Sequence, residues 1–540
     1  MIRLALASLA TLLAASSAAA GTITLEASLS PLDRWVARAQ AIAQVEGADA
    51  DAVNQAIGQF GFVRVAYGID STEPIYATAS IEEAGGEPDL ATMQVAVLFR
   101  TLRREQFERA GVNFADPTAL YIMNDPLPPG TQLFAASDGT HTLLTGRRDD
   151  ATMARLTSVK KAATAIAGDL SRTRLLARLD ASESSAEMRT VIVEGFQDGF
   201  RRALPEEYPS DPTGDPKTDA AAAIGERLAI EVLSRWVTDL VDLLTAADRI
   251  EIAVDWEESL AAAASVRAMW SDPAITDGIG AMQPLPPLSS RPAAFGVTVG
   301  TTLPDAVRQR LDRDTAEAAG ALRELIELAR DEGPLTAILA DTLSRRRLRE
   351  MMQSLLDDGR LRQQAGFYSL GGDRAAMALF AASSDPQAVT DTLREIGEAA
   401  GDAPAERDAH GYRLLELADE KTIGDGKPKT WVGTTDRRLA IVFGNDDSID
   451  VLKPQPPEPK APAPVWAAAT LDFALMDAVG PTMNRLFEQS EEETVPIKTG
   501  QLGLTLGPTG ETPGELRGAE LQLTIDAAFV REVIREGAKQ

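Results

Sequence analysis

Side chains that commonly carry chemistry are scarce in this sequence. It has no Cys and two His, His141 and His410, which lie in different halves of the chain. Without Cys, a zinc site would need carboxylates for most of its ligands, and no HExxH pattern is present. We therefore interpret both His as isolated polar residues near turns. The sequence predicts no metal site and no cofactor.

Two short patterns match parts of a serine-nucleophile site. Residues 158–161 read SVKK and residues 498–500 read KTG, the SxxK and KTG signatures of penicillin-binding enzymes. The third signature, SDN, is missing, and no GxSxG elbow occurs. Since such short patterns match easily by accident, we assign no catalytic residue. We favour a non-catalytic protein, although a hydrolase that uses carboxylates alone stays an alternative.

Acidic stretches offer a further possible chemistry, the binding of calcium. One is Asn445–Asp450, NDDSID, and the other is the series Asp211, Asp215 and Asp219. Neither has the central Gly and closing Glu of an EF-hand loop. Solvated acidic loops are the preferred interpretation.

One basic cluster, Arg345–Arg347 with Arg349, falls on a predicted helix. Acidic residues follow in the next turns, beginning with Glu350. A face of the helix that is covered by salt bridges is therefore favoured over an anion site.

The elements that would position these residues show a repeat. Residues 132–146 and 430–444 each read as a hairpin, in which an apolar strand leads to an Asp and a polar turn. A second apolar strand then ends at a Gly eight residues after the Asp. Asp138 pairs with Asp436, and Gly146 with Gly444, at one offset of 298.

Two further Asp pairs extend the repeat. Asp180 matches Asp472, and Asp255 matches Asp526, each at the end of an apolar strand that precedes a predicted helix. An Asp in this position usually caps the helix by accepting hydrogen bonds from its first backbone N–H groups. We therefore predict structural roles for these paired residues.

The repeat predicts an α+β fold of two similar lobes that arose by tandem duplication. Each lobe is expected to hold a mixed or antiparallel sheet that is covered by long helices. The first lobe is predicted at 21–281 and the second at 293–540, joined by a Pro-rich linker at 282–292; a second Pro-rich tether spans 454–464. A helix at 220–247, apolar from Leu228 to Leu244, is predicted in the core of the first lobe.

The N-terminus predicts export. Residues 1–20 contain Arg3, an apolar run from Leu4 to Leu13 and small residues up to Ala20, the layout of a cleaved signal peptide. Cleavage there would remove one Arg and no acid, leaving 52 basic and 81 acidic residues, a net charge of −29. Such a charge repels nucleic acid and anionic lipid head groups. We expect a periplasmic or secreted bacterial protein with no integral membrane segment after cleavage.

These observations leave three functional hypotheses. The first is a non-catalytic binding or interaction module that holds an unknown protein partner. The second is a carrier of a small apolar ligand, and the third is the carboxylate hydrolase. An exposed apolar patch would favour the first, and a large apolar cavity would favour the second.

Overall fold

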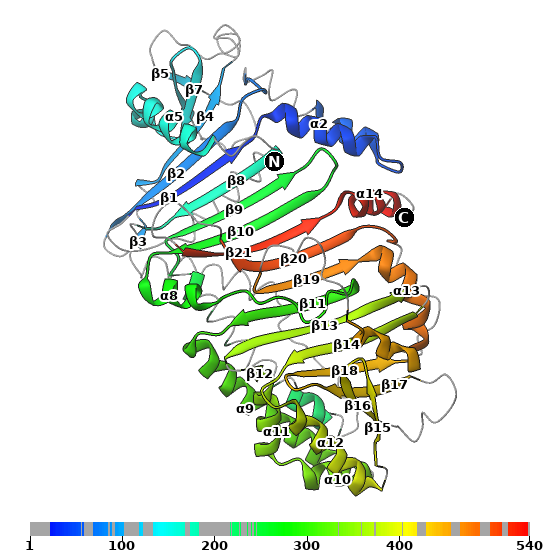
Figure 1. The fold of residues 1–540 in the computed structure, drawn as a ribbon. Helices are drawn as coiled ribbons and strands as arrows, with labels where there is room; N and C mark the ends of the chain where they lie inside the picture. Colours follow the sequence, from blue (N-terminus) through cyan, green and yellow to red (C-terminus); the bar gives the residue numbers. More distant parts are fainter. Residues whose placement is uncertain are drawn as a thin grey trace. The chain divides into compact units, whose positions relative to one another are not determined.

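The chain was examined as a computed structural model (Figure 1). The structure describes residues 22–55, 57–58, 69–84, 87–88, 92–101, 118–121, 133–167, 173–182, 217, 219–225, 227, 235, 239, 242–244, 246–332, 334–357, 359–371, 374–401, 403–417, 428–454, 465–486, 497–509 and 517–537. The predicted signal peptide at 1–20 lies outside these residues.

The chain divides into two compact units. Unit 1 takes in residues up to 204, 241–272 and 512 onward, and unit 2 takes in 205–240 and 273–511. This division differs from the two consecutive lobes that the sequence predicts. Unit 2 receives 205–240 from the predicted first lobe, and unit 1 receives the last stretch of the predicted second lobe.

Unit 1 is built on an antiparallel sheet, as predicted for an α+β fold. In spatial order its strands are β5 (Thr118–Tyr121), β6 (Leu133–Ser137), β7 (His141–Thr145), β4 (Gln94–Arg100), β2 (Ile75–Ala84), β1 (Thr22–Leu29), β8 (Thr173–Asp180), β9 (Arg249–Trp256), β10 (Ala262–Trp270) and β21 (Arg517–Ile525). The short strand β3 (Glu87–Pro88) pairs with the end of β2.

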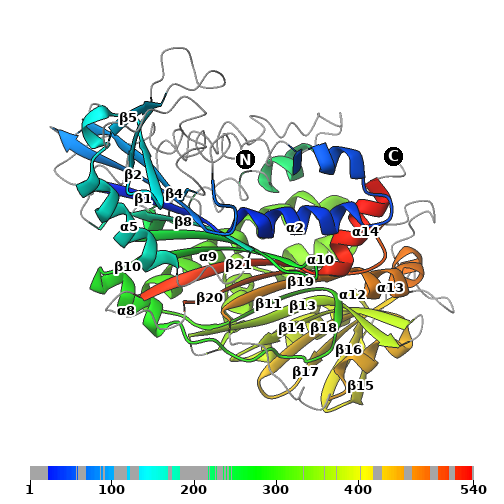
Figure 2. The same cartoon turned by 90° about the horizontal axis from the view of Figure 1, so that it is seen from above.

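Helices of unit 1 flank this sheet. They are α2 (Leu32–Ala43), α5 (Met153–Ala167) and α14 (Ala527–Gly537), with a 3₁₀ turn η2 (Arg148–Asp150) before α5. Figure 2 shows α5 against the sheet, where it contacts β6, β4 and β1. Leu156 and Val159 of α5 pack on Leu98 and Leu143 in the main core of the unit. Aliphatic residues at i and i+3 give α5 the apolar stripe that this contact needs.

Unit 2 has its own antiparallel sheet. In spatial order its strands are β20 (Gln501–Pro508), β19 (Ala467–Asp472), β11 (Ala293–Thr302), β13 (Arg360–Gly371), β14 (Arg374–Ala382), β18 (Arg438–Gly444), β17 (Lys429–Thr434), β16 (Tyr412–Leu417) and β15 (Ala405–Ala409). The short strand β12 (Leu356–Asp357) pairs with β13.

Helices of unit 2 pack on this sheet or on one another. They are α8 (Pro273–Ala281), α9 (Asp305–Leu328), α10 (Pro334–Thr342), α11 (Arg345–Ser354), α12 (Pro386–Ala400) and α13 (Phe473–Leu486), with 3₁₀ turns η3 (Arg330–Glu332) and η5 (Asp446–Leu452). On one face, Val479 of α13 packs on Phe367, and Val389 of α12 packs on Val432. On the opposite face, η5 covers a core that includes Phe380 and Trp431.

Both predicted hairpins are present, but their correspondence is displaced by one residue. The turn of the first closes from the N–H of Asp138 to the carbonyl of His141, and that of the second from Thr435 to Arg438. Asp138 therefore corresponds to Thr435, not to Asp436, at an offset of 297. Because side chains alternate between sheet faces, a slip of one residue exchanges the two faces. The predicted pairs of Asp138 with Asp436 and of Gly146 with Gly444 are wrong for this reason.

The expectation for Asp255 is also wrong. β9 continues through Asp255 to Trp256 and turns directly into β10, with no helix between them. Asp255 instead lies 3.2 Å from Arg174 on the paired strand β8. By contrast, Asp526 ends β21 immediately before α14, so the two residues hold different positions.

The segment predicted as a first-lobe helix is helical where the structure describes it, as at 219–225. Its residues 220–240 group with unit 2, where Arg227 pairs with Glu324 at 2.5 Å and Arg235 pairs with Glu317, and residues 241–247 group with unit 1. Most of its predicted apolar face, including Leu228, lies outside the described residues. Among the helices described, none is both long and apolar enough to cross a membrane.

Candidate functional site

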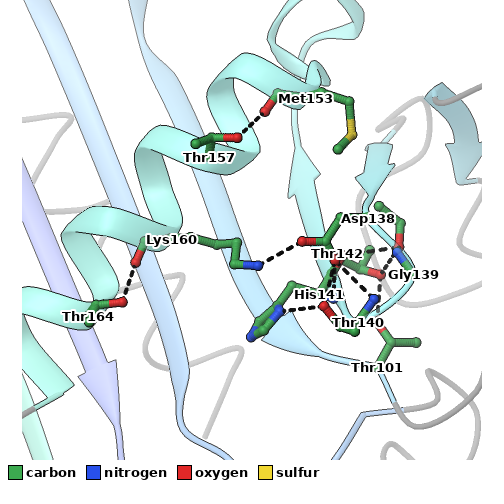
Figure 3. A network of polar contacts seen from close by, with 11 residues as sticks. Thr101, Asp138, Gly139, Thr140, His141, Thr142, Met153, Thr157, Lys160 and Thr164 are labelled. Carbon is green, nitrogen blue, oxygen red and sulfur yellow. Dashed lines mark hydrogen bonds and ion pairs between the residues drawn. The ribbon is translucent and has the colours of Figure 1, made fainter.

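Asp138 anchors the turn of the first hairpin, as the sequence predicts (Figure 3). Its Oδ1 accepts hydrogen bonds from the backbone N–H of Thr140 at 2.9 Å, from the Thr140 hydroxyl at 2.8 Å and from the backbone N–H of His141 at 2.8 Å. Lys160 of α5 donates to Oδ2 at 2.7 Å. Burial alone would raise the pKa of Asp138, but these donors outweigh it and hold the pKa well below its usual value. A carboxylate held in this way is a poor general base.

His141 follows in the same turn, and its Nδ1 lies 3.0 Å from the Thr140 hydroxyl. Burial, and then the charge of Lys160, lower the pKa of His141. The lowered pKa favours the neutral imidazole at pH 7, and the contact with Thr140 lies within the turn.

Two of the paired Asp residues are helix caps, as predicted. Asp472 accepts from the N–H of Leu475 at 3.0 Å at the start of α13, and Asp526 accepts from the N–H of Phe529 at 2.8 Å at the start of α14. Asp180 accepts instead from the N–H and hydroxyl of Ser182, at 3.1 and 2.6 Å. Each carboxylate satisfies backbone donors that would otherwise lack partners.

The acidic loop Asn445–Asp450 is neutralised by basic side chains. Asp446 lies 2.9 Å from Lys429, and Asp450 lies 2.7 Å from Lys453. Within the described residues, no three His, Asp or Glu side chains are grouped as metal ligands. Asp211 and Asp215 of the other acidic series lie outside those residues.

The remaining patterns are divided between the two units or are internally paired. Ser158 is exposed on α5 in unit 1, whereas Lys498 belongs to unit 2 and pairs with Asp477 at 3.5 Å. On α11, Arg346 pairs with Glu350 at 2.8 Å, as predicted for a helix face covered by salt bridges.

A pocket of about 440 Å³ opens in unit 2, on the face of the sheet that η5 covers. Its lining combines apolar residues (Leu288, Phe380, Tyr412, Val451, Leu452, Pro454), hydroxyl residues (Ser289, Ser290, Thr435) and basic residues (His410, Arg438, Lys453). Five separate stretches of chain contribute, which is why spacing in the sequence does not predict it. His410 stands out in the sequence as one of two His, but no local pattern points to the other lining residues.

An apolar row crosses the other face of the unit 2 sheet. Ladder pairing aligns one residue from each of six adjacent strands. In order they are Leu504, Ala469, Val297, Ala365, Leu379 and Ile441. Leu504 is 41% exposed, and Val297, Leu379 and Ile441 are exposed by 36–37%. At about 4.8 Å between strands, the row is roughly 24 Å long.

A matching row lies in unit 1. Ladder pairing there aligns Ile252, Ala177, Ala27, Ala77, Val97 and Leu144. Ile252 is 46% exposed, and the row continues through Val266 and Leu521, which are exposed by 38% and 42%. None of these residues is fully buried.

The opposite face of the same unit 1 strands carries alternating charges. Ladder pairing aligns Glu520, Arg267, Glu251, Arg178 and Glu26. Arg267 lies 3.0 Å from Glu520, and Arg178 lies 2.7 Å from Glu251. The apolar row is thus confined to one face of these strands.

In unit 2 the sequence carries a signal for the apolar row. Strand β18 contains the uninterrupted run LAIVF, which indicates apolar residues on both faces of the sheet.

Fold and sites together define an α+β protein of antiparallel sheets with exposed apolar rows and one partly basic pocket. No protein-family model matches the chain, and no curated protein matches it. It is similar to a solved structure titled "Structure of crystal form I of TP0453", with 11% sequence identity over 46% of this chain and 96% of that chain, at a TM-score of 0.18. A TM-score this low supports no conclusion about fold or function.

Proposed function

We propose that this protein is an exported, non-catalytic binding protein whose sheets present an apolar face to a protein partner. The observation that carries the proposal is the exposed row from Leu504 to Ile441 in unit 2. Keeping aliphatic side chains in water costs about 25 cal/mol per Å² of apolar surface. A contiguous exposed apolar patch on a soluble domain is typical of a surface that becomes buried in a complex.

The net charge of the chain indicates which kind of partner the apolar face would bind. A net charge of −29 after signal cleavage disfavours anionic lipid head groups and favours a protein with basic residues around its apolar contact. Export rests on residues 1–20, whose pattern is that of a signal peptide. The hydrolase hypothesis gains no support from Asp138, Asp472 or Asp526, because backbone donors occupy these carboxylates.

Tandem duplication is part of the proposal, and strand order supports it. Unit 1 orders its strands β6-β7-β4-β2-β1-β8-β9, and unit 2 orders β17-β18-β14-β13-β11-β19-β20 in the same sequence of connections. Following the ladders from the hairpins makes Leu144 equivalent to Ile441 and Ile252 equivalent to Leu504. The two apolar rows then coincide at all six positions, and the pair Asp180 with Asp472 is retained at its predicted offset.

The alternating charged residues of unit 1 do not recur in unit 2 under the same correspondence. Glu251, Arg178 and Glu26 become Gly503, Thr470 and Gly296 in unit 2. The two units thus share the apolar row but not the charges behind it, which supports a function for the row. An experimental structure tests the duplication: superposing β1, β2, β4 and β7 on β11, β13, β14 and β18 should bring the six paired positions together, and a different register would refute it.

Native mass spectrometry of the protein isolated gently from its host tests the binding role. Wild type should carry a companion protein, and the double variant Leu379→Glu, Ile441→Glu should lose it, because two charges would be buried without partners. Leu322→Glu on α9 is the matched control, since Leu322 is 39% exposed but lies outside the sheet. It should retain the companion. Wild type without a companion, or a double variant that keeps it, would overturn the proposal.

A further inference from the structure

Hydrogen bonds hold the segments that line the pocket around His410. Gln364 holds the Ser289 segment through two hydrogen bonds, from the N–H of Ser289 at 2.8 Å and to its carbonyl at 3.0 Å. Arg291 donates to the carbonyl of Asp450 at 2.7 Å and so fixes the end of η5 that carries Lys453. The pocket is therefore formed before any ligand arrives, as small-molecule sites usually are.

The charge of the lining is opposite to that of the chain. Among the described residues that line the pocket there is no Asp or Glu, while His410, Arg438 and Lys453 are present. Asp450, which precedes the lining residue Val451, pairs with two of these basic residues, with Lys453 at 2.7 Å and with His410 at 3.4 Å. Lys453 holds the pKa of Asp450 below its usual value. Arg438 is exposed, and its side chain has no ion pair within the described residues.

The backbone at His410 explains how this side chain reaches the pocket lining. His410 and Gly411 form the two-residue turn between β15 and β16, with φ of +54° and +84°. Positive φ at both central positions defines a type I′ turn, in which Asn-Gly is strongly preferred. His is, with Asn and Asp, enriched among the non-Gly residues that adopt positive φ, so this turn places His410 in the pocket lining without unusual strain.

We propose that this pocket binds a small organic anion, a carboxylate attached to an apolar body. The carboxylate pairs with Arg438, whose planar guanidinium can donate two parallel hydrogen bonds, and His410 and Ser290 complete the polar side. The apolar body lies on Leu288 and Phe380. The proposal does not depend on the apolar row, which occupies the other face of the sheet.

Isothermal titration calorimetry with phenylacetate tests the site. Phenylacetate should bind with one-to-one stoichiometry, and phenylacetamide, which has the same shape without the charge, about tenfold more weakly. Inorganic phosphate should also bind at least about tenfold more weakly, because it lacks the apolar body. Equal affinity of the amide or of phosphate, or no binding of phenylacetate, would overturn the proposal.

Substitutions in and beside the pocket test where phenylacetate binds. Arg438→Gln should weaken the binding of phenylacetate about tenfold. Arg437→Gln removes the same charge from the same turn but lies outside the lining, so it should leave the affinity for phenylacetate unchanged. His410→Asn should weaken binding without lowering Tm, since Asn suits the type I′ turn. The double variant Leu379→Glu, Ile441→Glu should bind normally, which separates this site from the apolar row. Equal effects of the two Arg variants would refute the assignment.

Discussion

At the scale of single residues, the carboxylate of Asp138 links pH to stability. Its folded-state pKa is lowered, so its stabilisation is present above the unfolded-state value of about 3.9 and is lost as pH falls through the folded-state pKa. Asp138→Asn should cost about 1 kcal/mol at pH 7, a figure reduced for partial exposure. The difference from wild type should shrink as pH falls below 4, measured by urea unfolding at each pH. Asp436→Asn, in the exposed turn of the second hairpin, is the control and should change little; a gap that stays constant with pH would contradict this role.

Gly300 shows how a single missing Cβ can matter. A Cβ there would lie 2.6 Å from the carbonyl oxygen of Leu285, and the N–H of Leu285 donates to Gly300 at 2.8 Å, which ties the two backbones together. Gly300→Ala should therefore cost about 1–3 kcal/mol of unfolding free energy. Gly278→Ala in α8, where no atom lies within 4 Å, should be neutral or stabilising by about 0.5–1 kcal/mol. Similar values for the two variants would count against the close approach.

At the scale of elements, Asp472 decides where α13 begins. Asp472→Ala removes the acceptor for the Leu475 N–H and should cost about 1 kcal/mol. Hydrogen exchange should show faster exchange in the first turn of α13. Asp477→Ala, on the same helix, removes only an exposed ion pair of 3.5 Å and should cost less than about 0.5 kcal/mol. Unchanged protection in Asp472→Ala would show that the cap is dispensable.

The hairpins and helix starts were easier to predict from the sequence than the register in which the two hairpins correspond. The alternation and turn residues around Asp138 and Arg438 predict both hairpins, and the strand-to-helix junctions at Asp472 and Asp526 predict the caps. The register could not be predicted from the sequence, because Asp138 and Asp436 occupy different positions within their turns. The helix expected after Asp255 failed because a strand that continues for one more residue before a hairpin looks locally like a strand before a helix. The pocket depends on pairing between distant strands, which no local pattern specifies.

At the scale of the whole molecule, the proposed duplication and the exposed rows make one joint prediction. Ile252→Glu in unit 1 and Leu504→Glu in unit 2 replace side chains that are already 46% and 41% exposed, so each should change the free energy of unfolding by about 0.5 kcal/mol or less. Leu98 of β4 and Phe380 of β14 lie on the opposite sheet faces, occupy equivalent positions in the proposed duplication and are each 4% exposed. Burying a carboxylate at either should cost more than about 4 kcal/mol. Urea unfolding of the four variants compares the faces in both units. If the exposed positions proved as intolerant as the buried ones, the rows would be covered within the chain itself, and the partner surface would have to be sought elsewhere.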